Sequence, residues 1–221
     1  KDDSGMNDYC NKTGIARWAA DNGYDNFDYH DLADCVLMNP GNPLKLNIDL
    51  NNDGKLVPTT IPNSYLGLAK YERKYQALEF SLDRPFDGTW GLSASYVLGA
   101  NKGTAEGYVQ SQLDQEDAGV TQDFDFGSFT NGSYGYLPND RRHTFKIFGN
   151  YQLSENFRIG ANFVASSGRP KSCIGFVPET VPDYYGPDGD FTGGPGEYLS
   201  ASSYYCLDDA GRTRLSQRGT F

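Results

Sequence analysis

The sequence predicts an all-β chain, a segment of an antiparallel transmembrane β-barrel with two hairpins and long extracellular loops. Three observations support this fold class. Two stretches alternate apolar and polar residues with a period of two on both sides of a short turn, which is typical of two-faced strands. Each alternating segment runs for about ten residues, the length that crosses a bilayer at a tilt. The connections at the other end are long and polar, as in membrane barrels.

The first hairpin is expected over residues 77–99. Leu78, Phe80 and Leu82 alternate with small, polar or charged residues, and residues 84–88 (RPFDG) supply turn chemistry. The alternation then resumes on an ascending strand, whose apolar set is Trp90, Leu92, Ala94, Tyr96 and Leu98.

The second hairpin repeats this pattern around a turn at residues 154–156. Its apolar positions are Phe145, Ile147, Gly149, Tyr151 and Leu153 before the turn, and Phe157, Ile159, Ala161, Phe163 and Ala165 after it. Membrane barrels direct apolar residues outward and polar residues inward. The candidate lumen-lining residues are therefore Glu79, Asp83, Lys146, Asn150 and Arg158.

The rest of the chain is expected to form external loops. Residues 1–70 are predicted to be an extracellular loop region, with one helix signal from Ile15 to Ala20. Residues 71–165 hold the strands, with a long loop at about 100–140, and residues 166–221 form a second loop that is cut before the final strands. The strands of a soluble β-sandwich also alternate apolar and polar residues, but they average about 5–6 residues. Connections as long as residues 100–140 and 166–221 are unusual in compact soluble domains.

Composition excludes several classes of protein. Hydrophobic residues make up 38% of the chain, and the 16 Tyr and 13 Phe are more than a disordered chain contains. The net charge of −10 argues against a nucleic-acid partner, because binding phosphates needs a basic surface. No run of about 18 apolar residues predicts a transmembrane helix. The start does not resemble a signal peptide, so we expect a processed chain or a fragment.

The four cysteines fall into two local pairs. Cys10 and Cys35 lie in one polar stretch, and Cys173 and Cys206 lie in another. Four cysteines allow three connectivities, and the pairs 10–35 and 173–206 are favoured because each pair shares one loop. Disulfides would indicate passage through an oxidising compartment such as the periplasm. The alternative is four free thiols in a cytosolic protein.

One short segment resembles the start of a calcium-binding loop. Asp49, Asn51 and Asp53 followed by Gly54 match the D-x-N-x-D-G pattern, in which alternate oxygens converge on one ion. The twelfth position is Thr60 rather than the usual Glu, and no helix pair is evident. A plain Asx-rich turn explains the segment as well, and any calcium would be structural.

No residues predict catalysis, so the chain is not expected to be an enzyme. Residues 140–143 (DRRH) place a His beside charges, but they lie at the foot of a strand, where a charge network is common. The Gly-rich run 186–196 lacks the Lys and Ser/Thr of a phosphate-binding loop. An acidic stretch could attract cationic ligands, but it is interpreted as a solvated loop surface: Asp114, Glu116, Asp117, Asp123 and Asp125.

Three segments resemble the late barrel strands of TonB-dependent outer-membrane receptors, particularly the Oar-like group. They are residues 75–96 (YQALEFSLDRPFDGTWGLSASY), 135–145 (GYLPNDRRHTF) and 167–173 (SGRPKSC). The resemblance covers residues 70–175 and implies a barrel of about 22 strands closed by a plug. It also implies a location in the bacterial outer membrane and active import of a scarce ligand.

The resemblance implies three partners: outer-membrane lipid, TonB through a missing N-terminal part, and an unidentified small ligand. It implies no cofactor, apart from the structural calcium considered above. Two alternatives remain open: a secreted or surface β-sandwich binding or adhesion module with structural calcium, and a diffusion porin. A plug in the parent gene would separate import from a porin, and partition into detergent would separate both from the sandwich.

Overall fold

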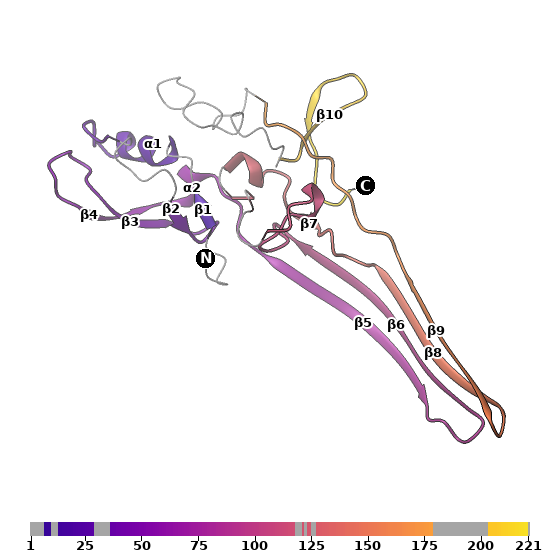
Figure 1. Ribbon diagram of the computed structural model, residues 1–221. Helices are drawn as coiled ribbons and strands as arrows, with labels where there is room; N and C mark the ends of the chain where they lie inside the picture. Colours follow the sequence, from indigo (N-terminus) through magenta and orange to yellow (C-terminus); the bar gives the residue numbers. More distant parts are fainter. Residues whose placement is uncertain are drawn as a thin grey trace.

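The computed structural model of the 221-residue chain describes residues 7–9, 13–28, 36–117, 121, 123–124, 127–178 and 203–220. A long, narrow sheet extends from a cluster of smaller elements, and its two hairpin turns lie at the far end (Figure 1). Within the described residues, no helix is both long and apolar enough to cross a membrane.

The long sheet consists of two consecutive hairpins. Its strands are β5 (Arg73–Arg84), β6 (Trp90–Gly103), β8 (His143–Ser154) and β9 (Phe157–Ser166), hydrogen-bonded in that order, and the short β7 (Gly135–Tyr136) pairs with the end of β6. All neighbours are antiparallel. The expected antiparallel hairpins are therefore present, with strands of 10 to 14 residues.

The turn between β5 and β6 is closed by one carboxylate. Asp87 Oδ1 accepts hydrogen bonds from the backbone N–H groups of Thr89 and Trp90, at 2.9 and 3.1 Å. Asp87 Oδ2 accepts a hydrogen bond of 2.6 Å from Arg84. Gly88 has φ +99°, a left-handed conformation that glycine adopts without a steric penalty. The turn chemistry expected at residues 84–88 is thus observed.

The other end of the sheet carries a folded region that we call the cap: the described residues within 7–72, 104–142 and 167–220. Besides β7, its elements are β1 (Asn7–Tyr9), α1 (Thr13–Asp21), β2 (Val36–Met38), β3 (Leu44–Ile48), β4 (Val57–Ile61), α2 (Asn63–Leu66), two 3₁₀ turns (Ser111–Leu113 and Gly127–Thr130), β10 (Tyr205–Leu207) and β11 (Thr213–Leu215). The short strands form three two-stranded sheets, β1–β2, β3–β4 and β10–β11.

A small hydrophobic core holds the cap together. It contains Ile15, Met38, Leu44, Ile61, Leu66, Leu68, Ala105 and Phe124. The helix expected at Ile15 to Ala20 is α1, which places Ile15 and Ala19 in the interior. Because Ala105 and Phe124 come from the connection after β6, the N-terminal part and this connection fold as one unit.

The C-terminal segment is tied into the cap through Arg218, whose side chain is 1% exposed. Its Nε donates to the carbonyl oxygen of Ser133 at 2.7 Å, and its Nη2 donates to that of Thr104 at 3.1 Å. Its backbone N–H donates to the carbonyl of Gly132 at 2.9 Å. The described parts of both long connections therefore pack together rather than extending into solvent.

Candidate functional site

The strand register gives the long sheet one apolar face. Residues directly opposite each other in antiparallel strands place their side chains on the same face, and the apolar stripes of all four strands meet in this way. The opposed pairs include Leu78–Leu98, Phe80–Tyr96, Leu82–Ala94, Tyr96–Phe145, Ala94–Ile147 and Ile147–Phe163. The shared apolar face predicted from the alternation is confirmed.

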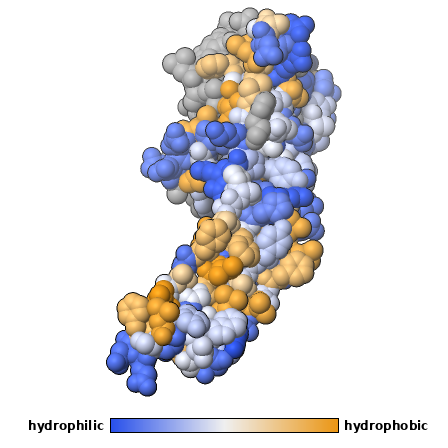
Figure 2. All heavy atoms as spheres, turned by 90° about the vertical axis from the view of Figure 1, so that its right-hand side faces the viewer, coloured by the Kyte–Doolittle hydropathy of each residue, from blue (hydrophilic) through white to orange (hydrophobic). Residues whose placement is uncertain are grey.

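This apolar face is uncovered within the described part of the chain. Leu78, Phe80 and Leu82 are 61 to 63% exposed, and Phe163 is 58% exposed. Apolar side chains gather over the strand-built part of the molecule in Figure 2. Continuous apolar surface of this kind marks an interaction surface rather than a face in contact with water. No second sheet among the described residues packs on it, so the alternative of a β-sandwich receives no support.

The five candidate lumen-lining residues share the opposite face. The register places Glu79 opposite Val97, Asp83 opposite Ser93, Lys146 opposite Ser95, Asn150 opposite Gly91 and Arg158 opposite Gln152. The Arg158 Nε donates to Gln152 Oε1 at 2.8 Å, and its guanidinium lies 4.1 Å from the centre of the Phe86 ring. The structure thus brings these residues onto one polar surface; that this surface borders a lumen stays a prediction.

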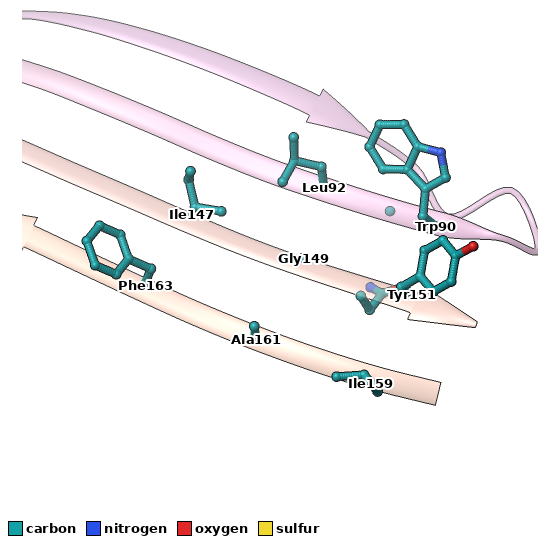
Figure 3. Close-up of a pocket in the computed structure, with 10 residues that line it drawn as sticks. Trp90, Leu92, Ile147, Gly149, Tyr151, Ile159, Ala161 and Phe163 are labelled. Atoms are coloured by element: carbon teal, nitrogen blue, oxygen red, sulfur yellow. The ribbon is translucent and has the colours of Figure 1, made fainter. Parts of the chain in front are cut away.

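A hollow of about 490 Å³ interrupts the apolar face near the hairpin turns. It lies over Gly149, which has no side chain, and over the small Ala161, between larger neighbours (Figure 3). Trp90 and Tyr151 stand side by side at its turn end. Its lining is almost entirely apolar, so it offers no chemistry beyond contact with hydrocarbon.

The end of the apolar face next to the cap carries residues that the sequence analysis missed: Lys74, Lys102, Tyr136 and Arg142. β5 begins at Arg73, within the expected strand region of residues 71–165, and β6 continues to Gly103, past the point near residue 100 where the loop is expected to begin. Lys74 and Leu78 are four residues apart on β5, so their side chains point to the same face of the sheet. The same holds for Lys102 and Leu98 on β6. Continuing the alternation outward along both strands would have identified this pair.

Cys173 and Cys206 lie next to each other, as free thiols in this structure. A hydrogen bond with Cys206, together with burial, raises the pKa of Cys173 to about 11. The flanking backbone joins the same segments, since the Gly175 N–H donates to the Ser203 carbonyl at 3.0 Å. The disulfide stays a prediction that this proximity supports. Cys10 and Cys35 lie outside the described residues.

The candidate calcium residues form the turn between β3 and β4. Asp49 Oδ1 accepts hydrogen bonds from the backbone N–H groups of Asn51 and Asp53, at 3.2 and 3.1 Å. Asp49 Oδ2 accepts a hydrogen bond from the backbone N–H of Gly54. Slight burial raises the pKa of Asp49, but these backbone donors outweigh it and lower the pKa overall. Among the described residues no three His, Cys, Asp or Glu side chains converge on a metal position. Calcium at Asp49, Asn51 and Asp53 stays an untested alternative to the plain Asx-rich turn, whose hydrogen bonds are the ones observed.

The charged residues considered for catalysis have structural contacts. Asp140 is buried and accepts the backbone N–H of Asn101 at 2.6 Å. His143 Nδ1 lies 2.7 Å from the hydroxyl of Tyr96, and the two rings stack. Asp123, interpreted above as part of a solvated acidic stretch, is instead buried beside Arg218. That interpretation is wrong for Asp123, because the cap closes over it.

Comparison with known proteins gives a distant and partial similarity. The chain is 29% identical over 102 residues to the TonB-dependent transporter Oar of Myxococcus xanthus. The matched part covers 44% of this chain and 10% of that protein. No family model matches the chain, and no solved structure matches it. The matched part therefore spans about a tenth of the length of this curated relative. Less than half of the present chain takes part in the match.

Proposed function

We propose that this chain is a membrane-embedded part of a bacterial outer-membrane receptor of the TonB-dependent type, which imports a scarce ligand. The exposed apolar face of the long sheet is the observation that carries the proposal. In water, four stripes of Leu, Phe, Ile and Tyr side chains would be strongly unfavourable, at roughly 25 cal/mol per Å² of apolar surface. In a bilayer the same face contacts lipid tails.

The dimensions of the sheet support a membrane location. At about 3.3 Å per residue, strands of 10 to 14 residues reach across the hydrocarbon layer even when tilted. Trp90 and Tyr151 lie near the hairpin turns, where membrane barrels carry a girdle of aromatic residues. The turns would then face the periplasm and the cap would face the exterior.

Each part then has a role in uptake. The cap would bind the ligand, whose identity the chain does not name. The polar face with Glu79, Asp83, Lys146, Asn150 and Arg158 would line the passage. Energy would come from TonB, through a part of the protein outside this chain. The similarity to a protein named a TonB-dependent transporter supports this choice over a sandwich module or a diffusion porin.

Fractionation of cells that express the full-length protein tests the membrane location. The protein is expected to sediment with the outer membrane and to enter detergent rather than buffer. Recovery in the soluble fraction would overturn the proposal. Ligand uptake measured with and without TonB separates the two membrane functions: uptake that stops without TonB supports active import, and uptake that continues indicates a porin.

A further inference from the structure

The external end of the apolar face holds a compact group of basic and aromatic side chains. Lys74 on β5 lies directly opposite Lys102 on β6, and Lys102 lies directly opposite Tyr136 on β7. The Lys102 Nζ is 4.3 Å from the centre of the Tyr136 ring. The Arg142 guanidinium lies 5.8 Å from the same ring, and its Nη1 donates to the Tyr136 hydroxyl at 3.2 Å. We call these four residues the basic cluster.

The basic cluster continues the apolar face. Lys74 and Lys102 are each an even number of residues from Leu78 and Leu98 on the same strand, so their side chains point to the same face as the apolar stripes. Lys74 and Arg142 are exposed, and Lys102 is half-buried. One continuous surface therefore passes from hydrocarbon side chains to cations along the strands.

The basic cluster forms no ion pair in the described part of the chain. None of the ion pairs among the described residues involves Lys74, Lys102 or Arg142. Two ammonium groups directly opposite each other in a sheet repel, because their β-carbons are only about 5 Å apart. The net charge of the chain is −10, and Glu72 stands two residues before Lys74, but among the described residues neither it nor any other carboxylate forms an ion pair with the cluster. An anion between the two lysines would offset the repulsion.

We propose that the basic cluster binds the phosphate group of an anionic lipid in the outer leaflet. The guanidinium and the two ammonium groups would donate to phosphate oxygens, while the acyl chains would lie along the apolar face below. Tyr136 suits the boundary, since its ring packs with the cations and its hydroxyl remains polar. This inference rests on the proposed function, which places the cluster at the external edge of the hydrocarbon layer. A free phosphate ion would gain nothing from the adjoining apolar surface.

Lipid binding to the purified full-length protein tests the inference. Native mass spectrometry would count bound molecules while diphosphoryl lipid A, an uncharged galactolipid or inorganic phosphate is added. The triple variant Lys74→Gln/Lys102→Gln/Arg142→Gln removes the cations and keeps polar side chains. The matched control, Lys45→Gln/Lys55→Gln/Lys171→Gln, removes the same charge from exposed positions of the cap. The variant Lys74→Arg/Lys102→Arg keeps the charge.

The triple variant is expected to bind lipid A about 100-fold more weakly, from the usual contribution of each basic residue near an anionic lipid surface. The control and the arginine variant are expected to bind it as the unaltered protein does. Equal lipid A binding by the triple variant, or full occupancy by inorganic phosphate, would overturn the inference while leaving the membrane location intact. Recovery of the unaltered protein in the soluble fraction would overturn both proposals.

Discussion

Arg218 and Asp123 form a charged pair inside the cap, with Arg218 Nη2 and Asp123 Oδ2 3.8 Å apart and side chains only 1% and 5% exposed. Tyr204 completes the group, since its ring centre lies 5.0 Å from the Arg218 guanidinium. The pair joins the C-terminal segment to the connection that follows β6. These buried polar contacts hold the C-terminal segment in the cap, as the hydrophobic core holds the N-terminal part.

Replacing Arg218 with Met is expected to release the C-terminal segment from the cap. The change removes the cation beside the buried Asp123 and leaves two buried backbone carbonyls without their donor, at a cost of about 3–5 kcal/mol. Arg212→Met is the control, because Arg212 pairs with Asp208 at the surface and such pairs contribute about 0–1 kcal/mol. Backbone amide exchange of residues 203–220 measures the effect. Equal protection in both variants would show that the pair contributes no more than a surface ion pair.

The stability of the cap is expected to fall as pH rises from about 4. Burial raises the pKa of Asp123 above its ordinary value of 3.8, although Arg218 opposes the shift; Glu106 adds to it. The folded cap then binds this proton more tightly than the unfolded chain does. The stability that the proton contributes is present below the ordinary pKa and is lost as pH rises through the raised one. Amide exchange across this range should show the slope, and Asp123→Asn should remove it.

A new positive charge is expected to destabilise the protein when it is placed on the apolar face of the sheet and to have little effect on the polar face. Phe80→Arg places a cation on the apolar face, which costs about 2–4 kcal/mol where that face meets lipid near the bilayer midplane. Ser81→Arg is the control, because the neighbouring residue lies on the polar face. Urea unfolding of the full-length protein in lipid vesicles measures both. Similar losses in the two variants would argue against lipid contact at Phe80.

The long sheet was predictable because its signal is local. Alternation within ten residues identifies a two-faced strand, and the short turns fix which strands pair, so the faces of Phe80 and Glu79 follow from the sequence alone. The end of β6 was less predictable. Lys74 and Lys102 continue the alternation with charged side chains, which resemble loop residues when they are read singly.

The cap was not predictable because its contacts join distant segments. Arg218 bonds to the carbonyl of Ser133, 85 residues earlier in the chain. Ala105 and Phe124 share a core with Ile15, and no periodic pattern links these positions. A polar, Tyr- and Asp-rich composition indicates loops, and nothing in it distinguishes a solvated Asp from the buried Asp123.

The proximity of Cys173 and Cys206 leads to a specific disulfide prediction. Protein isolated from the cell envelope is expected to carry the 173–206 bond, and the 10–35 bond with it. Closing a loop of this length stabilises a fold by about 3–4 kcal/mol, so Cys206→Ser should increase amide exchange in β10. Peptide mapping without reduction identifies the bonds. A cross-linked peptide joining Cys10 to Cys173 would contradict the assignment of each pair to its own loop.

The turn at Asp49 is expected to form without calcium. Its carboxylate already accepts three backbone N–H groups, the pattern of an Asx-rich turn, and Asp53 is paired with Lys55 at 3.7 Å. Calcium titration of the full-length protein should therefore give no heat that depends on this turn. Asp53→Asn is the sensitive variant, because it removes one candidate ligand and leaves the Asp49 hydrogen bonds in place. Heat that the unaltered protein shows and Asp53→Asn lacks would establish the calcium site, and the missing twelfth ligand would then have to come from outside the turn.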